Sequence, residues 1–344
     1  MSLTYRTRRR MRRIGLVALA ALLIGIAVWF CWVIWLERHV VYSDDGAHLD
    51  FDLSEDVGVG QLALPPSALE TIPVYVNEGS AAINTSTELA RITGYYIDAE
   101  MLAEDIAGIR ETIASLPSGT AVMMEVKHIK GGFYYTSYLE DAVSATSVDV
   151  AAVDSLIKDI TDRNLYLIAS VPAFRDRNFG LNHVSSGLPV PEKGYLWMDQ
   201  EGCYWLDPTD AGTQSWLISI VNELKSLGFD EVVFTDFCFP NTTKIEFKDD
   251  RVEAIQKAAA TMVSTCATER FAVSFIATGS TVQPVEGRSR LYLLNVAPRD
   301  VEAIAAQYEV ADAGINLVFQ ATTNDTRYDN YSVLRPLDTA GDQD

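Results

Sequence analysis

The feature that most restricts the fold of this chain is a repeated alternation of short apolar runs and amphipathic segments beyond about residue 71. The apolar runs are rich in β-branched and aromatic residues, which favour strands. They lie at Ile92–Ile97, Ala121–Val126, Leu165–Val171, Glu231–Phe234, Phe271–Ile276, Leu291–Val296 and Ile315–Phe319. Segments with apolar residues at three- and four-residue steps separate several of them, at Ala99–Leu116, Val150–Thr161, Thr213–Leu227 and Asp250–Cys266. Strands alternating with helices of this length predict a parallel sheet covered by helices.

Two architectures satisfy this pattern, an open doubly wound sheet and a closed (β/α) barrel. No G-x-G-x-x-G follows an early strand, which removes the usual mark of a dinucleotide-binding open sheet. Polar loops with carboxylates and aromatic residues follow the strands instead, as in barrel enzymes. We therefore predict a (β/α)8-type TIM barrel of seven or eight strands. Residues 71–77 or 331–335 are the candidates for the eighth strand.

The N-terminal segment is of a different kind. Six arginines lie within residues 6–13, and Ile14–Leu36 then runs 23 residues without a charge. At about 1.5 Å per residue this stretch spans the roughly 30 Å hydrocarbon core of a bilayer. Its outer end carries three tryptophans, which favour the membrane interface, and the arginines before it place the N-terminus in the cytoplasm. We expect a cytoplasmic tail (1–13), a single-pass anchor (14–36), an acidic stalk (37–70) and an extracellular barrel domain (71–344).

The charge of the chain excludes some partners. All 47 acidic residues follow the anchor, whereas only 21 of the 27 basic residues do, so the outer part carries a net charge of −26. Such a domain repels nucleic acid, and we expect no nucleic-acid partner. The four histidines and four cysteines show no metal-ligand spacing, so we predict no metal and no cofactor. One disulfide among Cys203, Cys238 and Cys266 and three free thiols are both compatible with the sequence.

Four consecutive segments resemble one bacterial family of predicted glycoside hydrolases, whose catalytic barrel is distantly similar to that of α-amylases. The segments are AVMMEVKHIKGGFYYTS (121–137), LYLIASVPAFRD (165–176), WMDQEGCYWLDPTD (197–210) and GFDEVVFTDFCFP (228–240). The resemblance implies a (β/α) barrel that acts on polysaccharide. It also implies substrate-binding roles for four residues that this chain keeps, namely Lys127, Asp176, Trp205 and Asp207.

The chain departs from the family pattern at several positions. Glu125 stands where the family has an aspartate, and Ser170 where it has an arginine. In the fourth segment the strand-end aspartate falls on Thr235, a tyrosine on Asp236 and an arginine on Cys238. Because side chains alternate along a strand, Asp236 points away from the face of Thr235 unless a bulge or the strand end redirects it.

Glycoside hydrolysis needs two carboxyl groups flanking the scissile bond. Glu125 and Asp236 are the candidate pair, with Glu125 the leading acid/base residue. We expect both to surround one concavity with Asp176, Trp205 and Asp207, because each lies at or after a strand end. Simpler interpretations stay open: Lys127 pairing with Glu125, Trp205 packing over the barrel mouth, and Asp207 bracing a turn.

Three functions fit these features. The first is a membrane-anchored hydrolase of cell-wall or extracellular polysaccharide. The second is a catalytically inactive barrel that binds glycan, and the third is a structural module of the cell envelope. An inward-facing carboxylate pair favours the first, an aromatic groove without such a pair the second, and a filled barrel mouth the third.

Overall fold

The computed structural model describes Trp29 and residues 40–43, 46–49, 89–277 and 282–337. It divides into two compact units, Met1–Gly79 and Ser80–Asp344. In the first unit, β1 (Val40–Ser43) pairs antiparallel with β2 (Gly46–Leu49). Apart from Trp29, the expected span Ile14–Leu36 lies outside the described residues. Within the described residues, no helix has the length and apolarity needed to cross a membrane. The anchor stays a prediction.

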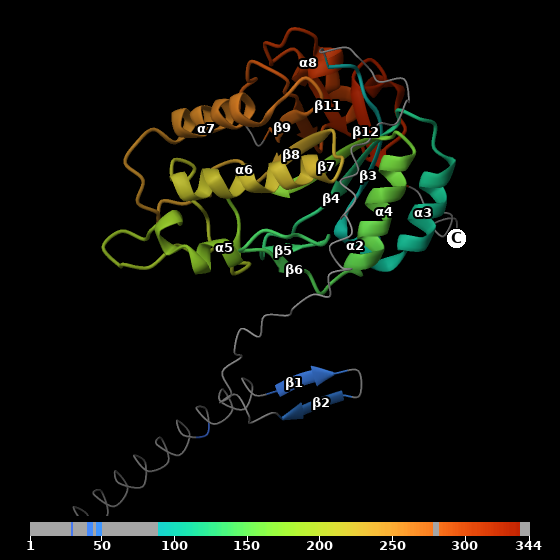
Figure 1. The fold of residues 1–344 in the computed structure, drawn as a ribbon. Coiled ribbons are helices and arrows are strands. Elements are labelled where there is room, and N and C mark those ends of the chain that lie inside the picture. The colour runs from blue at the N-terminus through green and yellow to red at the C-terminus, as the bar shows by residue number, and fades with distance from the viewer. Residues whose placement is uncertain (1–28, 30–39, 44–45, 50–88, 278–281, 338–344) are drawn as a thin grey trace, which may run out of the picture. The chain divides into compact units, whose positions relative to one another are not determined.

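Eight parallel strands of the second unit close into a barrel (Figure 1). They are β3 (Thr93–Ile97), β4 (Ala121–Glu125), β7 (Tyr166–Pro172), β8 (Glu231–Thr235), β9 (Ala272–Ile276), β10 (Leu291–Leu294), β11 (Leu317–Gln320) and β12 (Ser332–Pro336). The barrel closes where β12 pairs with β3. The predicted TIM barrel is confirmed, and β12 corresponds to the 331–335 candidate. Residues 71–77 lie outside the described part of the chain.

Helices cover the outside of the strands in Figure 1, most clearly α3, α4, α6 and α7. The helices are α2 (Ala99–Glu104), α3 (Ile106–Ser115), α4 (Val150–Asp162), α5 (Arg177–Asn182), α6 (Ala211–Ser226), α7 (Arg251–Cys266), α8 (Val301–Ala305) and α9 (Ala313–Asn316). The described residues also form 3-10 turns, η2 (Val184–Ser186), η3 (Pro298–Asp300) and η4 (Thr326–Tyr328). Two short strands, β5 (Gly132–Phe133) and β6 (Val143–Ser144), pair beside α5.

Aspartates begin most of the longer helices. The side chain at each N-cap accepts a hydrogen bond from a backbone N–H of the first turn, a contact that favours helix initiation. These residues are Asp98, Asp105, Asp149, Asp176, Asp210 and Asp250 for α2 to α7 in order. The cap at Asp105 also explains a difference from the sequence. The expected helix Ala99–Leu116 is two helices, because Asp105 leaves the helical conformation (φ −146°) and starts a new one.

The interior of the barrel is apolar through most of its depth. Its core residues are Ile92, Ala121, Met123, Ile168, Val233, Tyr292, Val318 and Leu334. A larger apolar layer lies between the strands and the covering helices. Strands buried on both faces explain why the sequence shows continuous apolar runs without polar alternation.

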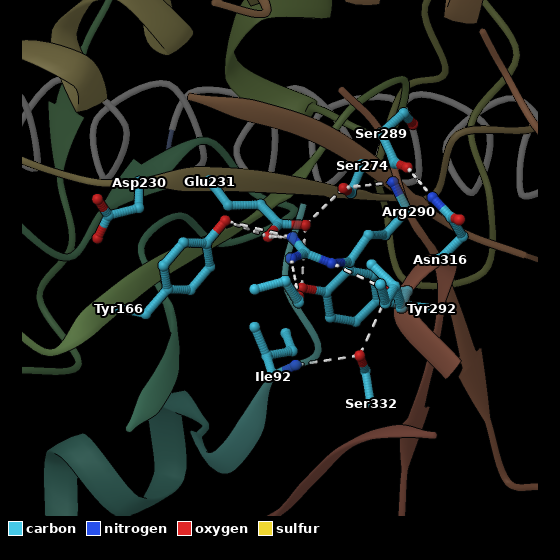
Figure 2. Close-up of polar contacts among 12 residues, drawn as sticks. Ile92, Tyr166, Asp230, Glu231, Ser274, Ser289, Arg290, Tyr292, Asn316 and Ser332 are labelled. Atoms are coloured by element: carbon cyan, nitrogen blue, oxygen red, sulfur yellow. Dashed lines mark hydrogen bonds and ion pairs between the residues drawn. The ribbon is translucent and has the colours of Figure 1, made fainter. Parts of the chain in front are cut away.

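A buried polar cluster closes the amino-terminal end of the barrel (Figure 2). Glu231, the first residue of β8, forms an ion pair with Arg290, and both side chains are almost completely buried. The Glu231 carboxylate accepts hydrogen bonds from the hydroxyls of Tyr166 (2.9 Å) and Tyr292 (3.1 Å). Arg290 also donates to the carbonyl oxygen of Ala90 at 2.8 Å. The carboxylate of Glu231 and the guanidinium of Arg290 thus both have further hydrogen-bond partners besides each other. A buried ion pair requires such additional hydrogen bonds.

Candidate active site

A cavity of about 690 Å³ opens at the carboxyl ends of the barrel strands. This is the face where barrel enzymes place their chemistry, and the volume is typical of a small-molecule site. Seven of the eight strands contribute to its lining, through Tyr96 and Ile97, Met123 and Glu125, Ser170 and Pro172, Thr235, Ile276, Leu294, and Gln320. Lys127, Tyr134 and Asp236 also line it. We refer to this cavity as the barrel mouth.

Glu125 is the last residue of β4, so its side chain leaves the apolar interior and enters the mouth. One carboxylate oxygen accepts a hydrogen bond from the backbone N–H of Ala99 at 3.1 Å. Burial raises the pKa of Glu125, the hydrogen bond from Ala99 lowers it, and the nearby charge of Asp98 raises it further. The net effect is a raised pKa, which is the property of a carboxyl group that can hold a proton for delivery.

Asp236 follows the last residue of β8 and has a left-handed backbone conformation (φ +48°). Non-glycine residues adopt this conformation rarely, aspartate more readily than most, and such residues cluster at functional sites. The turn breaks the strand alternation, so Thr235 and Asp236 both line the mouth. The turn at the end of the strand therefore directs Asp236 into the mouth, although strand alternation alone would point it away from the mouth. Burial also raises the pKa of this carboxyl group, with the charge of Arg175 acting against the rise.

Glu125 and Asp236 belong to strands separated by β7 alone. Two strand spacings correspond to about 10 Å between backbones. Side chains that enter one cavity from such positions can bring their carboxyl groups to the separations used in glycoside hydrolysis. Two of the carboxyl groups that line the mouth, Glu125 and Asp236, thus have raised pKa values and lie on opposite sides of β7.

Lys127 lines the mouth but forms its ion pair with Asp176, at 2.7 Å, instead of with Glu125. Beyond Glu125 the chain leaves the barrel, and Lys127 bridges to Phe133. Asp176 is 1% exposed and caps α5, accepting from the backbone N–H of Phe179 (2.9 Å) and the indole N–H of Trp216 (3.3 Å). Its carboxylate is fully occupied by protein groups, so it stabilises the loop that follows β7.

Trp205 lies in the same connection between β7 and α6, where it pairs with Arg175, and is 8% exposed. Its indole N–H donates to Asp199 at 3.1 Å, and the guanidinium of Arg175 lies 5.9 Å from the centre of its ring. Arg175 forms ion pairs with Asp199 (2.6 Å) and Glu201 (3.1 Å). The ring therefore supports the loop, whereas the simpler interpretation had it packing over the barrel mouth, which it does not line.

Asp207 braces a turn. One carboxylate oxygen accepts from both the backbone N–H (2.8 Å) and the hydroxyl (2.6 Å) of Thr209. The structure therefore corrects the expectation of one concavity around five residues. It brings Glu125 and Asp236 together with Lys127 and places Asp176, Trp205 and Asp207 outside the lining. The substrate-binding role of these three residues stays a prediction.

Tyr134 is a mouth residue that the sequence analysis did not identify. Its pKa is raised to about 12, first by burial and then by the charge of Glu125, so its hydroxyl stays protonated near the carboxylate. The residue lies in the first family-like segment, directly after β5. Asp98, Glu100 and His128 complete the polar lining. In the described part of the chain, no group of three or more histidine, cysteine or acidic side chains is placed to hold a metal ion.

The family departures are concentrated in the mouth. Ser170 and Thr235, which replace an arginine and an aspartate of the family pattern, both line the cavity. Cys238 is partly buried, and burial raises the pKa of its thiol to about 11. Among the described residues, Cys203, Cys238 and Cys266 are free thiols. The changes thus alter the chemistry at the mouth while leaving Glu125 and Asp236 in its lining.

The fold and this mouth define a TIM-barrel domain with a polar cavity at its catalytic face. The chain belongs to the family described as "Putative glycosyl hydrolase domain", whose sequence profile matches residues 99–278. The four segments that carried the resemblance all lie within this range. No protein with curated annotation matches the chain.

Several solved structures are similar to the barrel. A hypothetical protein from Ruminiclostridium thermocellum is 21% identical, with 52% of this chain and 96% of that chain covered and a TM-score of 0.45. An exo-β-N-acetylglucosaminidase from Vibrio harveyi is 9% identical (72% and 50% covered, TM-score 0.47), so this chain spans half the length of that enzyme. The glycoside hydrolase domain of PelA from Pseudomonas aeruginosa is 11% identical (74% and 98% covered, TM-score 0.42).

Proposed function

We propose that the barrel hydrolyses glycosidic bonds of a cell-wall or extracellular polysaccharide. The observation that carries the proposal is the pair of carboxyl groups, Glu125 and Asp236, that line one cavity at the carboxyl ends of the strands. Membership of the glycosyl hydrolase family supports the same reaction class. The left-handed conformation of Asp236 adds support, because Asp236 lines the mouth beside Thr235, the residue that replaces the family aspartate.

In this proposal Glu125 is the general acid and Asp236 the second carboxyl group. Burial keeps Glu125 protonated to higher pH, so it can give its proton to the leaving oxygen. The ionised form of Asp236 then activates a water molecule or attacks the developing oxocarbenium centre. The backbone N–H of Ala99 donates to Glu125 and holds it in position, and the Tyr134 hydroxyl is near enough for the charge of Glu125 to raise its pKa.

A second candidate is a barrel that binds glycan without cleaving it. The observation that favours it is the loss of the family arginine and aspartate at Ser170 and Thr235, both within the mouth. A barrel that keeps the cavity but loses these groups retains a glycan-sized hollow without the full charge set of the family.

One experiment separates the two candidates. The purified full chain is incubated with a panel of cell-wall and capsular glycans, and binding and product release are measured in parallel. The hydrolase proposal expects new reducing ends from at least one glycan. Binding to a glycan without release of product would reject hydrolysis and support the binding module.

Replacing Asp98 with asparagine is expected to shift the alkaline limb of kcat/KM to lower pH by roughly half a unit. Burial is the main cause of the raised pKa of Glu125, and the charge of Asp98 adds to it. Removing that charge lowers the pKa, so the general acid loses its proton at lower pH. Asparagine also caps helices well, which preserves α2. The exposed N-cap Asp105→Asn is the control, and an alkaline limb that does not move would reject Glu125 as the acid.

We also propose that the domain is held on the outer face of the cytoplasmic membrane by Ile14–Leu36. The 23-residue uncharged run, the arginines before it and the tryptophans at its end support this location. Sequencing the N-terminus of the mature protein from its native membrane is expected to give a start before residue 14. A start downstream of residue 30 would show that the segment is a cleaved signal.

A further inference from the structure

A second hollow, of about 760 Å³, lies in the long connection between β7 and α6. Aromatic and aliphatic side chains dominate its lining, including Tyr195, Trp197 and Tyr204. Tyr195 is 59% exposed and Met198 is 45% exposed, so the lining is open to solvent. Exposed apolar side chains gathered around a hollow indicate a binding surface more often than an incidental feature.

The hollow is built on a paired scaffold. Antiparallel bridges join Pro189 to Leu196 and Met198 to Tyr204, so the aromatic residues are held on paired backbone. Gly180 packs against Tyr204 so closely that a Cβ atom there would lie 2.6 Å from the Cβ of Tyr204. The backbone N–H of Glu246 donates to the carbonyl oxygen of Pro189 at 2.8 Å and ties the scaffold to the segment after β8. These contacts fix the shape of the hollow before a ligand binds.

A short chain of neighbouring residues leads from the hollow to the barrel mouth. Met198, which lines the hollow, precedes Asp199, and Asp199 forms the 2.6 Å ion pair with Arg175. Arg175 is near enough to Asp236 for its charge to oppose the effect of burial on that carboxyl group's pKa. Both connections arise from the carboxyl ends of β7 and β8, so the hollow and the mouth share one face of the barrel.

The charge of the lining differs from that of the chain. The whole chain has a net charge of −20, yet the lining contains no carboxylate, and Lys244 is its one charged residue. Aromatic faces with one ammonium group suit a ligand that has apolar C–H faces and hydroxyl or amide acceptors. Pyranose sugars without charge have this combination. The acidic lining of the mouth, with Asp98, Glu100, Glu125 and Asp236, disfavours a polyanion in the adjoining site.

We propose that this hollow is a sugar-binding platform that holds uncharged pyranose units of a polymer at a distance from the mouth. Tyr195 and Trp197 supply the stacking surface, and Lys244 donates hydrogen bonds to the sugar. The inference rests on the proposed function for the identity of the ligand as glycan. It adds that the substrate is a neutral polymer long enough to occupy both the mouth and the platform.

The test compares Tyr195→Ala with the wild-type full chain on neutral oligosaccharides. The probes are the disaccharides and hexasaccharides of N-acetylglucosamine and of glucose. We expect the variant to bind hexasaccharides about tenfold more weakly, the loss expected for one aromatic contact. The loss of affinity should be larger for hexasaccharides than for disaccharides, because the proposal has the longer ligand occupy the mouth and the platform together. Tyr195→Phe keeps the ring and should restore hexasaccharide affinity.

Tyr138→Ala is the matched control, because Tyr138 is 87% exposed and lines neither hollow. If Tyr195→Ala and Tyr138→Ala behave alike on hexasaccharides that the wild type cleaves, the platform is wrong and the hydrolase proposal stands. If the wild type binds hexasaccharides without cleavage and Tyr195→Ala weakens that binding, the platform stands and hydrolysis fails. Failure of the wild type to bind any hexasaccharide overturns the platform.

Discussion

Changing Glu125 to glutamine is expected to lower kcat on a cleaved glycan by about 10²- to 10⁴-fold, the contribution typical of a positioned general acid. Glutamine keeps the shape of the side chain but has no proton to give to the leaving oxygen. The Asp236→Asn variant should lose activity to a similar extent, because an amide neither activates water nor attacks the sugar. The measurement is product release under saturating substrate, with affinity determined separately by titration.

The controls distinguish chemistry from folding. Both amide variants should keep near wild-type affinity and thermal stability, because each substitution keeps the size and shape of a side chain that lines the cavity. Glu104→Gln changes an exposed carboxylate at the end of α2 that does not line the mouth, and it should leave kcat unchanged. Robust product release by both Glu125→Gln and Asp236→Asn would reject this pair as the catalytic groups while keeping the enzyme.

The barrel could be predicted from sequence because its periodicity is simple. Parallel strands buried on both faces appear as uninterrupted apolar runs, and seven of them were visible. The eighth was ambiguous because β12 contains Arg335 and Pro336, which weaken its apolar pattern. The break between α2 and α3 was missed since Ile106 and Ile109 continue the helical spacing across Asp105. Asp105 is a capping residue that marks the start of α3, but the continuous apolar spacing around it gave no sign of a break.

The site was predictable in part. Glu125 ends a strand at a family position, and the structure places it in the mouth. Asp236 could not be assigned a direction from alternation, because its left-handed backbone depends on the turn after β8. Asp176, Trp205 and Asp207 are of residue types common in binding sites. In the structure their polar groups bond instead to Lys127, Asp199 and Thr209, respectively. Spacing along the chain reports which strand end a residue follows, and tertiary contacts decide what its side chain reaches.

The fourth family-like strand starts at the amino-terminal end of the barrel, on the opposite side from the mouth. Asp230 and Glu231 lie there, and Figure 2 shows Asp230 directed away from the cluster around Glu231. Asp230 accepts a hydrogen bond from the backbone N–H of Leu167 at 2.9 Å, and its pKa is raised to about 6, mainly by burial. The partner of Glu231 was not identifiable, because Arg290 is 59 residues away in sequence.

Arg290→Met is expected to lower the free energy of unfolding by about 3–5 kcal/mol, the cost of leaving one partner of a buried ion pair uncompensated. Glu231 would then remain as a charge that is almost completely buried, with only hydroxyl donors around it. Urea denaturation followed by circular dichroism gives this free energy. The exposed pair Arg110–Asp159 supplies the control, since its side chains are 44% and 39% exposed. Arg110→Met should cost less than about 1 kcal/mol.

The double variant Glu231→Leu, Arg290→Met tests the origin of that loss. Removing both charges also removes the need to compensate either, so the double variant should be more stable than Arg290→Met alone. The hydroxyls of Tyr166 and Tyr292 lose an acceptor in the double variant, which limits the recovery to part of the loss. If the two single losses simply add in the double variant, the pair does not act as a unit. The contribution of this buried polar cluster to stability would then come from the packing of the two side chains and not from their charges.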